Sequence, residues 1–179
     1  MLVKYDPDLV HLVGQFHASL ADLGEFTLRA PAQLPAPYRG LLAHEHHMTV
    51  TVENFHRCLV DVEVLAARTE GETYLRQILL RRQTDRSVVQ YGLVRLDLAQ
   101  LSPIVRAEIL SRKIPLGRVL IQHNVLRTIH LSQLWKVSCG PDLANIFGVE
   151  TGQVTYGRTA AILTEGKPTI ELLEVVTPV

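Results

Sequence analysis

Two charged residues in apolar segments give the strongest chemical signal in this sequence. Arg76 lies within residues 74–80 and Glu174 within residues 172–176, and both segments are otherwise mainly apolar. A charge in such a segment is costly to bury unless it is paired, protonated or used in binding. If both side chains point into one cavity, they form a ready pair for an anionic ligand that carries a hydroxyl group. Arg76 and Glu174 are therefore the first candidate catalytic residues.

The alternation of side chains along a strand bears on whether each charge points inward. Arg76 shares its parity with three apolar or aromatic residues, Tyr74, Ile78 and Leu80. This pattern favours an inward arginine over an exposed arginine at a sheet edge, the commonest alternative. The second strand is ambiguous, because Glu174 and Glu171 fall on opposite faces and periodicity does not decide which of them is buried.

Arg158 follows a Tyr-Gly pair at the start of a predicted strand. A glycine at position 157 can let a ligand or another chain come close to the backbone. An ordinary turn glycine beside a surface arginine explains the same residues equally well. Both interpretations of Arg158 stay open at this point.

His44, His46 and His47 invite a metal-site hypothesis. The spacing His-Glu-x-x-His is absent because residue 48 is Met, and no further ligand is spaced convincingly nearby. The sequence therefore favours a solvated histidine patch. It also lacks a Gly-x-Ser-x-Gly elbow and the glycine-rich phosphate loops, so we expect neither a metal nor an organic cofactor.

Composition narrows the class of protein. The chain has 179 residues with 47% hydrophobic content, enough for a single domain over residues 1–179, and its formal net charge is zero. A role on nucleic acid or on a membrane surface would normally need a basic excess. The N-terminus has no signal-peptide layout, and Cys58 and Cys139 do not form a disulfide framework. We expect a cytoplasmic protein with buried thiols.

Hydrophobic periodicity predicts an α+β fold with about six antiparallel strands. Helices are expected at residues 8–24, 101–109 and 141–147, and an extended connector at 30–37. Strands are expected at residues 58–68, 74–81, 87–96, 126–137, 154–163 and 169–176. Residues 38–57 are ambiguous, since short helical pieces compete with strand propensity at 49–52. Residues 118–152 are the least readable part of the chain.

Five stretches in this order resemble the chorismate pyruvate-lyase superfamily, including its uncharacterised relatives. They are Met48-Thr49 with Glu53, residues 74–80, Pro115-Leu116-Gly117, Tyr156-Gly157-Arg158 with Gly166-Lys167-Pro168, and Glu174 before Pro178. The resemblance covers about residues 40–178. It implies a chorismate lyase-like antiparallel sheet with packed helices and a buried, flap-covered ligand cavity.

The resemblance also implies a reaction. Similar enzymes cleave chorismate to 4-hydroxybenzoate and pyruvate without metal or organic cofactor. Carried over to this chain, Arg76 would take the ring carboxylate and Glu174 the oxygen at the far end of the ring. Met48, Leu116 and Gly117 would line or gate the pocket, and Arg158 would add positive potential. Aromatisation drives the elimination, so the protein must mainly orient the substrate and stabilise charge on the ether oxygen.

This sequence departs from those enzymes at two places. Leu93 stands after Gly92, where the short enzymes carry an arginine, and the connection between Gly117 and Tyr156 is longer. The first change removes a possible anion contact and the second alters whatever covers the pocket. Both bear on the substrate rather than on the fold.

Two functions therefore remain open. The first is a lyase that eliminates pyruvate from chorismate or a close relative. The alternative is a non-catalytic domain that binds or senses a small aromatic or cyclohexadienyl carboxylic acid, as the same fold does in GntR-type repressors. The absence of a helix-turn-helix segment before the first helix weakens the repressor version. A relative that kept the fold and lost the chemistry is a third possibility. The oligomeric state is not predicted.

Overall fold

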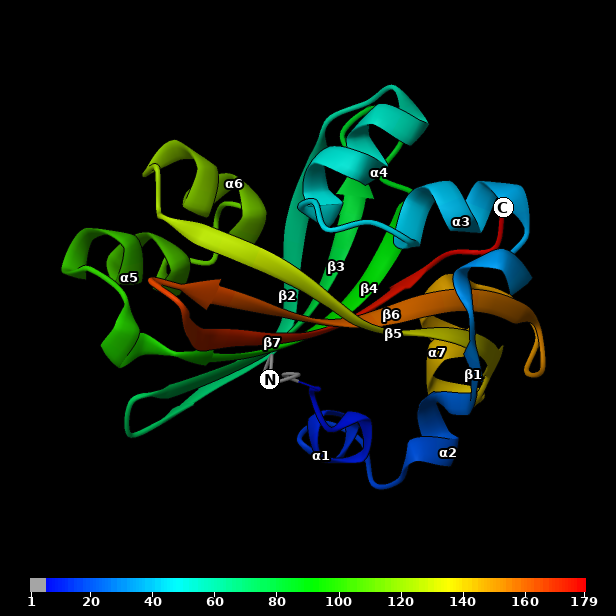
Figure 1. Cartoon of the computed structure of the whole chain (residues 1–179). Helices are drawn as coiled ribbons and strands as arrows, with labels where there is room; N and C mark the ends of the chain where they lie inside the picture. The colour runs from blue at the N-terminus through cyan, green and yellow to red at the C-terminus, as the bar shows by residue number, and fades with distance from the viewer. Residues whose placement is uncertain (1–5) are drawn as a thin grey trace.

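A seven-stranded antiparallel sheet forms the centre of the molecule, in a computed structural model that describes residues 6–179 (Figure 1). The strands are β1 (Gly24–Arg29), β2 (Val60–Glu70), β3 (Thr73–Arg82), β4 (Val88–Asp97), β5 (Arg127–Cys139), β6 (Val154–Thr164) and β7 (Lys167–Val176). Their order across the sheet is β1-β5-β6-β7-β4-β3-β2. The predicted α+β fold with an antiparallel sheet is confirmed. The expectation about a signal peptide rests mainly on residues 1–5, which lie outside the described range.

The predicted meander and hairpin are both present. Strands β2, β3 and β4 are neighbours in sequence and in the sheet, and β6 pairs with β7. The turns contain Gly71 at φ 60° and Gly166 at φ 77°, a backbone region in which glycine meets no steric penalty. Strand β7 then pairs with β4, which brings Glu174 next to the meander that carries Arg76.

The N-terminal region differs from its prediction. The expected helix at 8–24 is broken into α1 (Leu9–Gly14) and α2 (Leu20–Leu23), and Ser19 caps the second helix. The chain then enters β1, a strand that the sequence did not predict. This strand pairs with β5 more than a hundred residues later, so a long-range contact decides its conformation.

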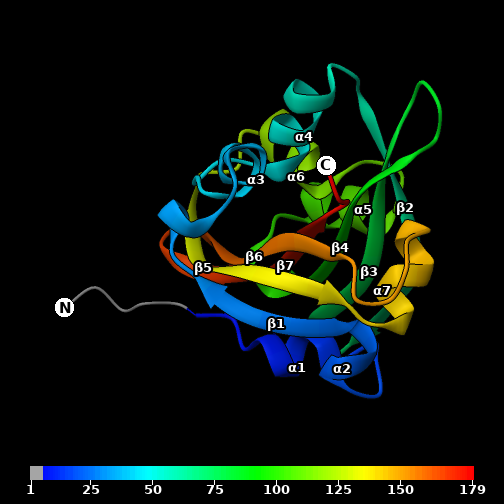
Figure 2. The ribbon, with the colours of Figure 1, turned by 90° about the vertical axis from the view of Figure 1, so that its right-hand side faces the viewer.

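Helices cover both faces of the sheet. The remaining helices are α3 (Ala36–Leu42), α4 (Met48–His56), α5 (Pro103–Leu110), α6 (Leu116–Gln122) and α7 (Pro141–Phe147). Figures 1 and 2 show α3, α4, α5 and α6 on one side of the sheet, and α1 and α2 on the other. Residues 49–52 are helical, and the expected connector at 30–37 contains a 3-10 turn at Pro31–Gln33. Among the described residues, no helix is long and apolar enough to cross a membrane.

The apolar core has three parts, and two of them share one face of the sheet. One part packs α5 and α6 on residues such as Val94, Ile162 and Leu172. A second part packs α3 and α4 on residues such as Ile78, Leu80 and Val176. The third part, with α1, α2 and α7, lies on the opposite face. Cys139 is buried in that third part, whereas Cys58 is half-buried, so the expectation of two buried thiols is wrong for Cys58.

Gly140 allows α2 and the end of β5 to touch. A Cβ atom at this position would overlap the backbone carbonyl oxygens of Ala21 and Asp22. We therefore expect Gly140→Ala to lower the free energy of unfolding by about 1–3 kcal/mol, because the backbone on both sides must shift. Urea unfolding followed by circular dichroism measures this change.

Gly40 provides the matched control. It is an exposed residue inside α3, and a Cβ atom there meets nothing within 4 Å. Gly40→Ala should stabilise the protein by about 0.5–1 kcal/mol, since alanine is the better helix former. If the two variants have equal stability, the close contact at Gly140 is not a constraint on the fold.

Candidate functional site

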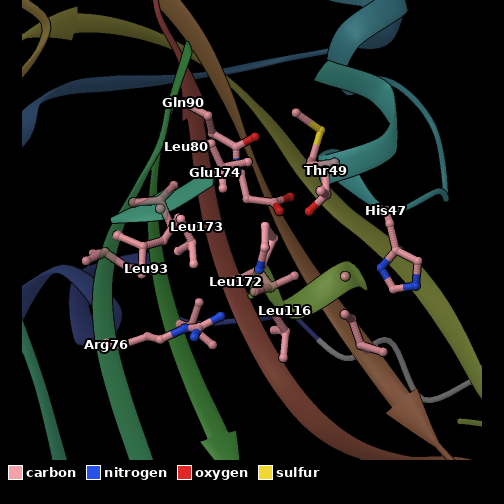
Figure 3. Close-up of a pocket in the computed structure, with 18 of the residues that line it drawn as sticks. His47, Thr49, Arg76, Leu80, Gln90, Leu93, Leu116, Leu172, Leu173 and Glu174 are labelled. Carbon is pink, nitrogen blue, oxygen red and sulfur yellow. The ribbon is translucent and has the colours of Figure 1, made fainter. Parts of the chain in front are cut away.

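A cavity lies between the sheet and helices α4 and α6, where the two core parts on that face meet. It is bounded on one side by strands of the sheet, mainly β3, β4, β6 and β7, and on the other by the first turns of α4 and α6 (Figure 3). Its apolar lining includes Val62, Ile78, Leu80, Val94, Ile129, Ile162 and Leu172, and its charged lining consists of Arg76, Arg158 and Glu174. An apolar chamber with a few convergent polar groups is the usual form of a small-molecule site.

All six residues proposed from the sequence lie at this cavity. They are Met48, Arg76, Leu116, Gly117, Arg158 and Glu174, and they come from five different elements. Gly117 lets α6 approach α4, since a Cβ atom there would lie 3.1 Å from Thr49 Oγ1 and 3.2 Å from His47 Cβ. The structure thus brings the candidate residues together around one cavity.

Arg76 is a buried cation with unused donors. Its side chain is only 1% exposed, and its Nε and Nη1 atoms have no hydrogen-bond partner among the described residues. Burial is the largest influence on its guanidinium and lowers its pKa. The sequence prediction that this arginine points inward agrees with its burial. A guanidinium in this state is suited to an incoming carboxylate, which it can bind through two parallel N–H groups.

Glu174 also faces the cavity, but it already has a partner. Its Oε2 accepts a hydrogen bond from Arg158 Nε at 2.7 Å. Glu171 lies on the other face of β7, where it pairs with Arg95 at 3.2 Å. The structure therefore decides the ambiguity in the sequence, with Glu174 buried and Glu171 partly exposed.

Arg158 connects the sheet to the segment that covers the cavity. Its Nη1 donates to the carbonyl oxygen of His44 at 2.8 Å, and its Nη2 donates to that of His46 at 3.1 Å. The side chain is 1% exposed and lies inside β6, so the interpretation as a surface arginine beside a turn glycine is wrong. Gly157 instead permits close strand packing, since a Cβ atom there would lie 2.8 Å from Glu174 O.

The histidines do not form a uniformly solvated patch. His47 is buried at the cavity wall, and its Nε2 accepts a hydrogen bond from Arg127 Nε at 2.6 Å. Burial, followed by Arg127, lowers the pKa of His47 to about 4. Burial, followed by Arg158, lowers the pKa of His44 to about 4 as well. Within residues 6–179, no group of three or more potential metal ligands is found.

Gln90 is a cavity residue that the sequence analysis missed. It is 2% exposed, and its Oε1 atom has no hydrogen-bond partner in the part of the chain that the structure describes. It lies on β4 with the parity of Gly92 and Val94, both of which line the cavity. This shared parity could have predicted that Gln90 points inward, but a single glutamine in a strand is equally consistent with a solvent-exposed side chain.

Leu93, which replaces the arginine of the short enzymes, does not point into the cavity. Its side chain belongs to the apolar core on the opposite face, together with Leu79, Tyr91 and Leu173. The longer connection after Gly117 is likewise ordered structure. It contains most of α6 and all of β5 and α7, and within it only Ile129 on β5 lines the cavity.

The cavity is small and partly enclosed. Its volume is about 40 Å³. The cover is held by several polar contacts, among them Arg118 with Glu53, which joins α6 to α4. A ring acid is larger than this space, so it can be bound only if the 43–47 segment, α4 or α6 moves.

Comparison with known proteins supports the fold. No family model and no curated protein matches the sequence. The effector domain of PhnF from Mycobacterium smegmatis is similar at a TM-score of 0.53 and 10% identity, over 74% of this chain and 88% of that domain. A longer PhnF chain has the same TM-score and identity, and this chain spans 64% of it.

A further solved structure is the ligand-binding domain of a Bordetella bronchiseptica protein assigned to the GntR family of transcriptional regulators. It has a TM-score of 0.49 and 15% identity, over 65% of this chain and 85% of that domain. At such identities a structural likeness shows the fold alone. The chain has the chorismate lyase-like fold, which it shares with the PhnF effector domain.

The buried pair of Arg158 and Glu174 should make a large contribution to stability. Arg158→Met leaves Glu174 unpaired and removes both contacts to the 43–47 segment. We expect a loss of about 3–5 kcal/mol in the free energy of unfolding, measured by urea titration. The double variant Arg158→Met/Glu174→Leu should recover part of this loss.

Arg95 on β4 and Glu171 on β7 provide the control, on the opposite face of the sheet. Both side chains are more than a third exposed, so Arg95→Met should change stability by at most about 1 kcal/mol. Equal losses in Arg158→Met and Arg95→Met would show that the buried pair has no special role.

The depressed pKa of His47 should make stability depend on pH. The unfolded chain takes up a proton near its ordinary value of 6.5, whereas the folded protein resists protonation until about pH 4. The contribution of His47 to the free energy of unfolding is therefore fully present above pH 6.5 and is lost as the pH falls toward 4. We expect the Tm to fall over this window, and His47→Gln to show a shallower fall. His11→Gln, at an exposed position, should retain the full wild-type slope.

Proposed function

We propose that this protein binds a small monocarboxylic acid in the cavity, without catalysing a reaction. The observation that supports the proposal most directly is the buried guanidinium of Arg76 with two unpartnered nitrogen atoms. An uncompensated buried charge destabilises a fold unless it is used. A carboxylate supplies the missing charge and can bind the guanidinium through two parallel N–H groups, one of which belongs to an unpartnered nitrogen atom. The regulator domains of the same fold are consistent with a binding role, in which a small acid in the cavity is the ligand of a sensor.

The charges at the cavity favour a single negative charge on the ligand. Arg76 and Arg158 are cations, and Glu174 neutralises Arg158 through their hydrogen bond. His44 and His47 are neutral at pH 7, because the pKa of each lies at about 4. One positive charge is left, and a monocarboxylate matches it. A dicarboxylate such as chorismate would bring a second charge with no cation left to pair with it.

Elimination of pyruvate from chorismate is the second candidate. It is favoured by the presence at one cavity of the six residues to which the resemblance assigns a role. The reaction asks for a group that donates to the departing oxygen or holds a hydroxyl. In this chain, Arg158 already donates to the Glu174 carboxylate, so that carboxylate is placed to accept hydrogen bonds rather than to act as an acid. The binding role therefore has the stronger support.

Arg76→Met should separate binding from stability. The variant removes a buried unpaired cation, so we expect the ligand-free protein to become about 1–3 kcal/mol more stable. Binding of 4-hydroxybenzoate, measured by isothermal titration calorimetry, should weaken by about 2–5 kcal/mol. Arg76→Lys should restore little of that affinity, because an ammonium group lacks the planar fork. Arg158→Met is the matched control, since that equally buried arginine is paired and its loss should destabilise the protein.

Two results would contradict the proposal. Unchanged affinity in Arg76→Met would remove the assigned role of this residue. Release of pyruvate from chorismate by the wild type, lost in Arg76→Ala and Glu174→Gln variants that remain folded, would replace the binding role by the lyase. Mixing the purified protein with chorismate and following pyruvate and 4-hydroxybenzoate tests the second point.

A further inference from the structure

We propose that Gln90 recognises the end of the ligand that is remote from its carboxylate, and that the ligand carries a hydrogen-bond-donating group there. This inference rests on the proposed monocarboxylate site and specifies the class of acid that it takes. The ligand is then an acid with an apolar middle and a neutral hydroxyl or amino group at its far end.

The first argument is the state of the Gln90 amide. The residue is 2% exposed, and its Oε1 atom finds no partner within residues 6–179. Its register partners on the flanking strands, Leu80 and Val176, are buried apolar residues. Buried side-chain oxygens almost always have a hydrogen-bond partner, so an unpartnered one at a cavity wall points to a ligand group.

The second argument is the position of Gln90 relative to the two charged residues. Along β4, Val94 is opposite Arg76, Gly92 is opposite Glu174, and Gln90 lies one step further on the same face. Val94 and Gln90 are four positions apart, which is about 13 Å along a strand. Figure 3 shows Arg76 at one end of the cavity, and Gln90 near Glu174 at the other.

The third argument is the chemistry of that far end. A carboxylate can only accept hydrogen bonds, and the free Gln90 Oε1 is a second acceptor beside it. A hydroxyl or amino group can donate to one or both of them. If the amide turns, a hydroxyl can donate to Glu174 and accept from Gln90 Nε2, so it matches either orientation. A second carboxylate would be repelled by Glu174. The apolar wall between the ends, which includes Ile78 and Leu172, suits a ring.

Calorimetric titration of the full chain with benzoate, 4-hydroxybenzoate and 4-aminobenzoate tests this assignment. The wild type should bind the two substituted acids about tenfold more tightly than benzoate. Gln90→Leu should lose this preference, with benzoate affinity unchanged or improved. Gln90→Met, of similar length, is the second variant should leucine disturb folding. Gln153→Leu, at an exposed position far along the chain, should keep the wild-type preference.

The outcomes separate the two proposals. If Gln90→Leu or Gln90→Met keeps the wild-type preference, the role of Gln90 is overturned, while Arg76-dependent binding of all three acids leaves the monocarboxylate site intact. If benzoate binds the wild type as tightly as the substituted acids, the far end recognises no donor and the inference fails. If the wild type binds none of the three acids, the proposed function and this inference fail together.

Discussion

The ion pair between Arg158 and Glu174 is the interaction on which the cavity depends. The two residues are register partners on β6 and β7, and the same guanidinium holds two carbonyl groups of the segment that covers the site. Neither charge could be buried without the other. The strand pairing places the two side chains opposite each other, and one guanidinium connects the carboxylate on the sheet to the cover of the cavity.

Arg76 differs from Arg158, a buried arginine whose hydrogen-bond partners all belong to the protein. Both arginines are 1% exposed, yet Arg158 has a carboxylate and two carbonyl groups around it, whereas two nitrogen atoms of Arg76 have no partner among the described residues. Selection for stability alone would favour an apolar residue at position 76. Strain and unpaired polar groups concentrate where a protein binds or reacts, because function is exchanged there for stability. The unpaired state of Arg76, rather than its burial, is thus the argument for a ligand.

Local patterns made part of this fold predictable. Strands β2 to β4 and the pair β6 and β7 are rich in apolar residues and are joined by short turns, so the sequence indicates them. Local patterns do not indicate strand β1, because only its first residue, Gly24, is fully buried and its conformation depends on pairing with the distant strand β5. They do not indicate α6 either, because a proline precedes this helix and a glycine lies inside it. At the site, motif resemblance located six residues. It could not reveal that Glu174 pairs with Arg158, since this contact follows from the register between β6 and β7.

The small size of the cavity connects binding to the position of its cover. A cavity of about 40 Å³ has no room for a ring acid until α4, α6 or the segment between α3 and α4 is displaced. The contacts that oppose this displacement are polar and specific, among them Arg127 with His47 and Arg158 with the carbonyl groups of His44 and His46. A ligand must supply the free energy that breaks or rearranges them, so its intrinsic affinity is reduced by that amount. Under the proposed binding role, the covering helices would differ between the empty and the filled protein, which is the kind of difference that a sensing domain needs in order to report its ligand.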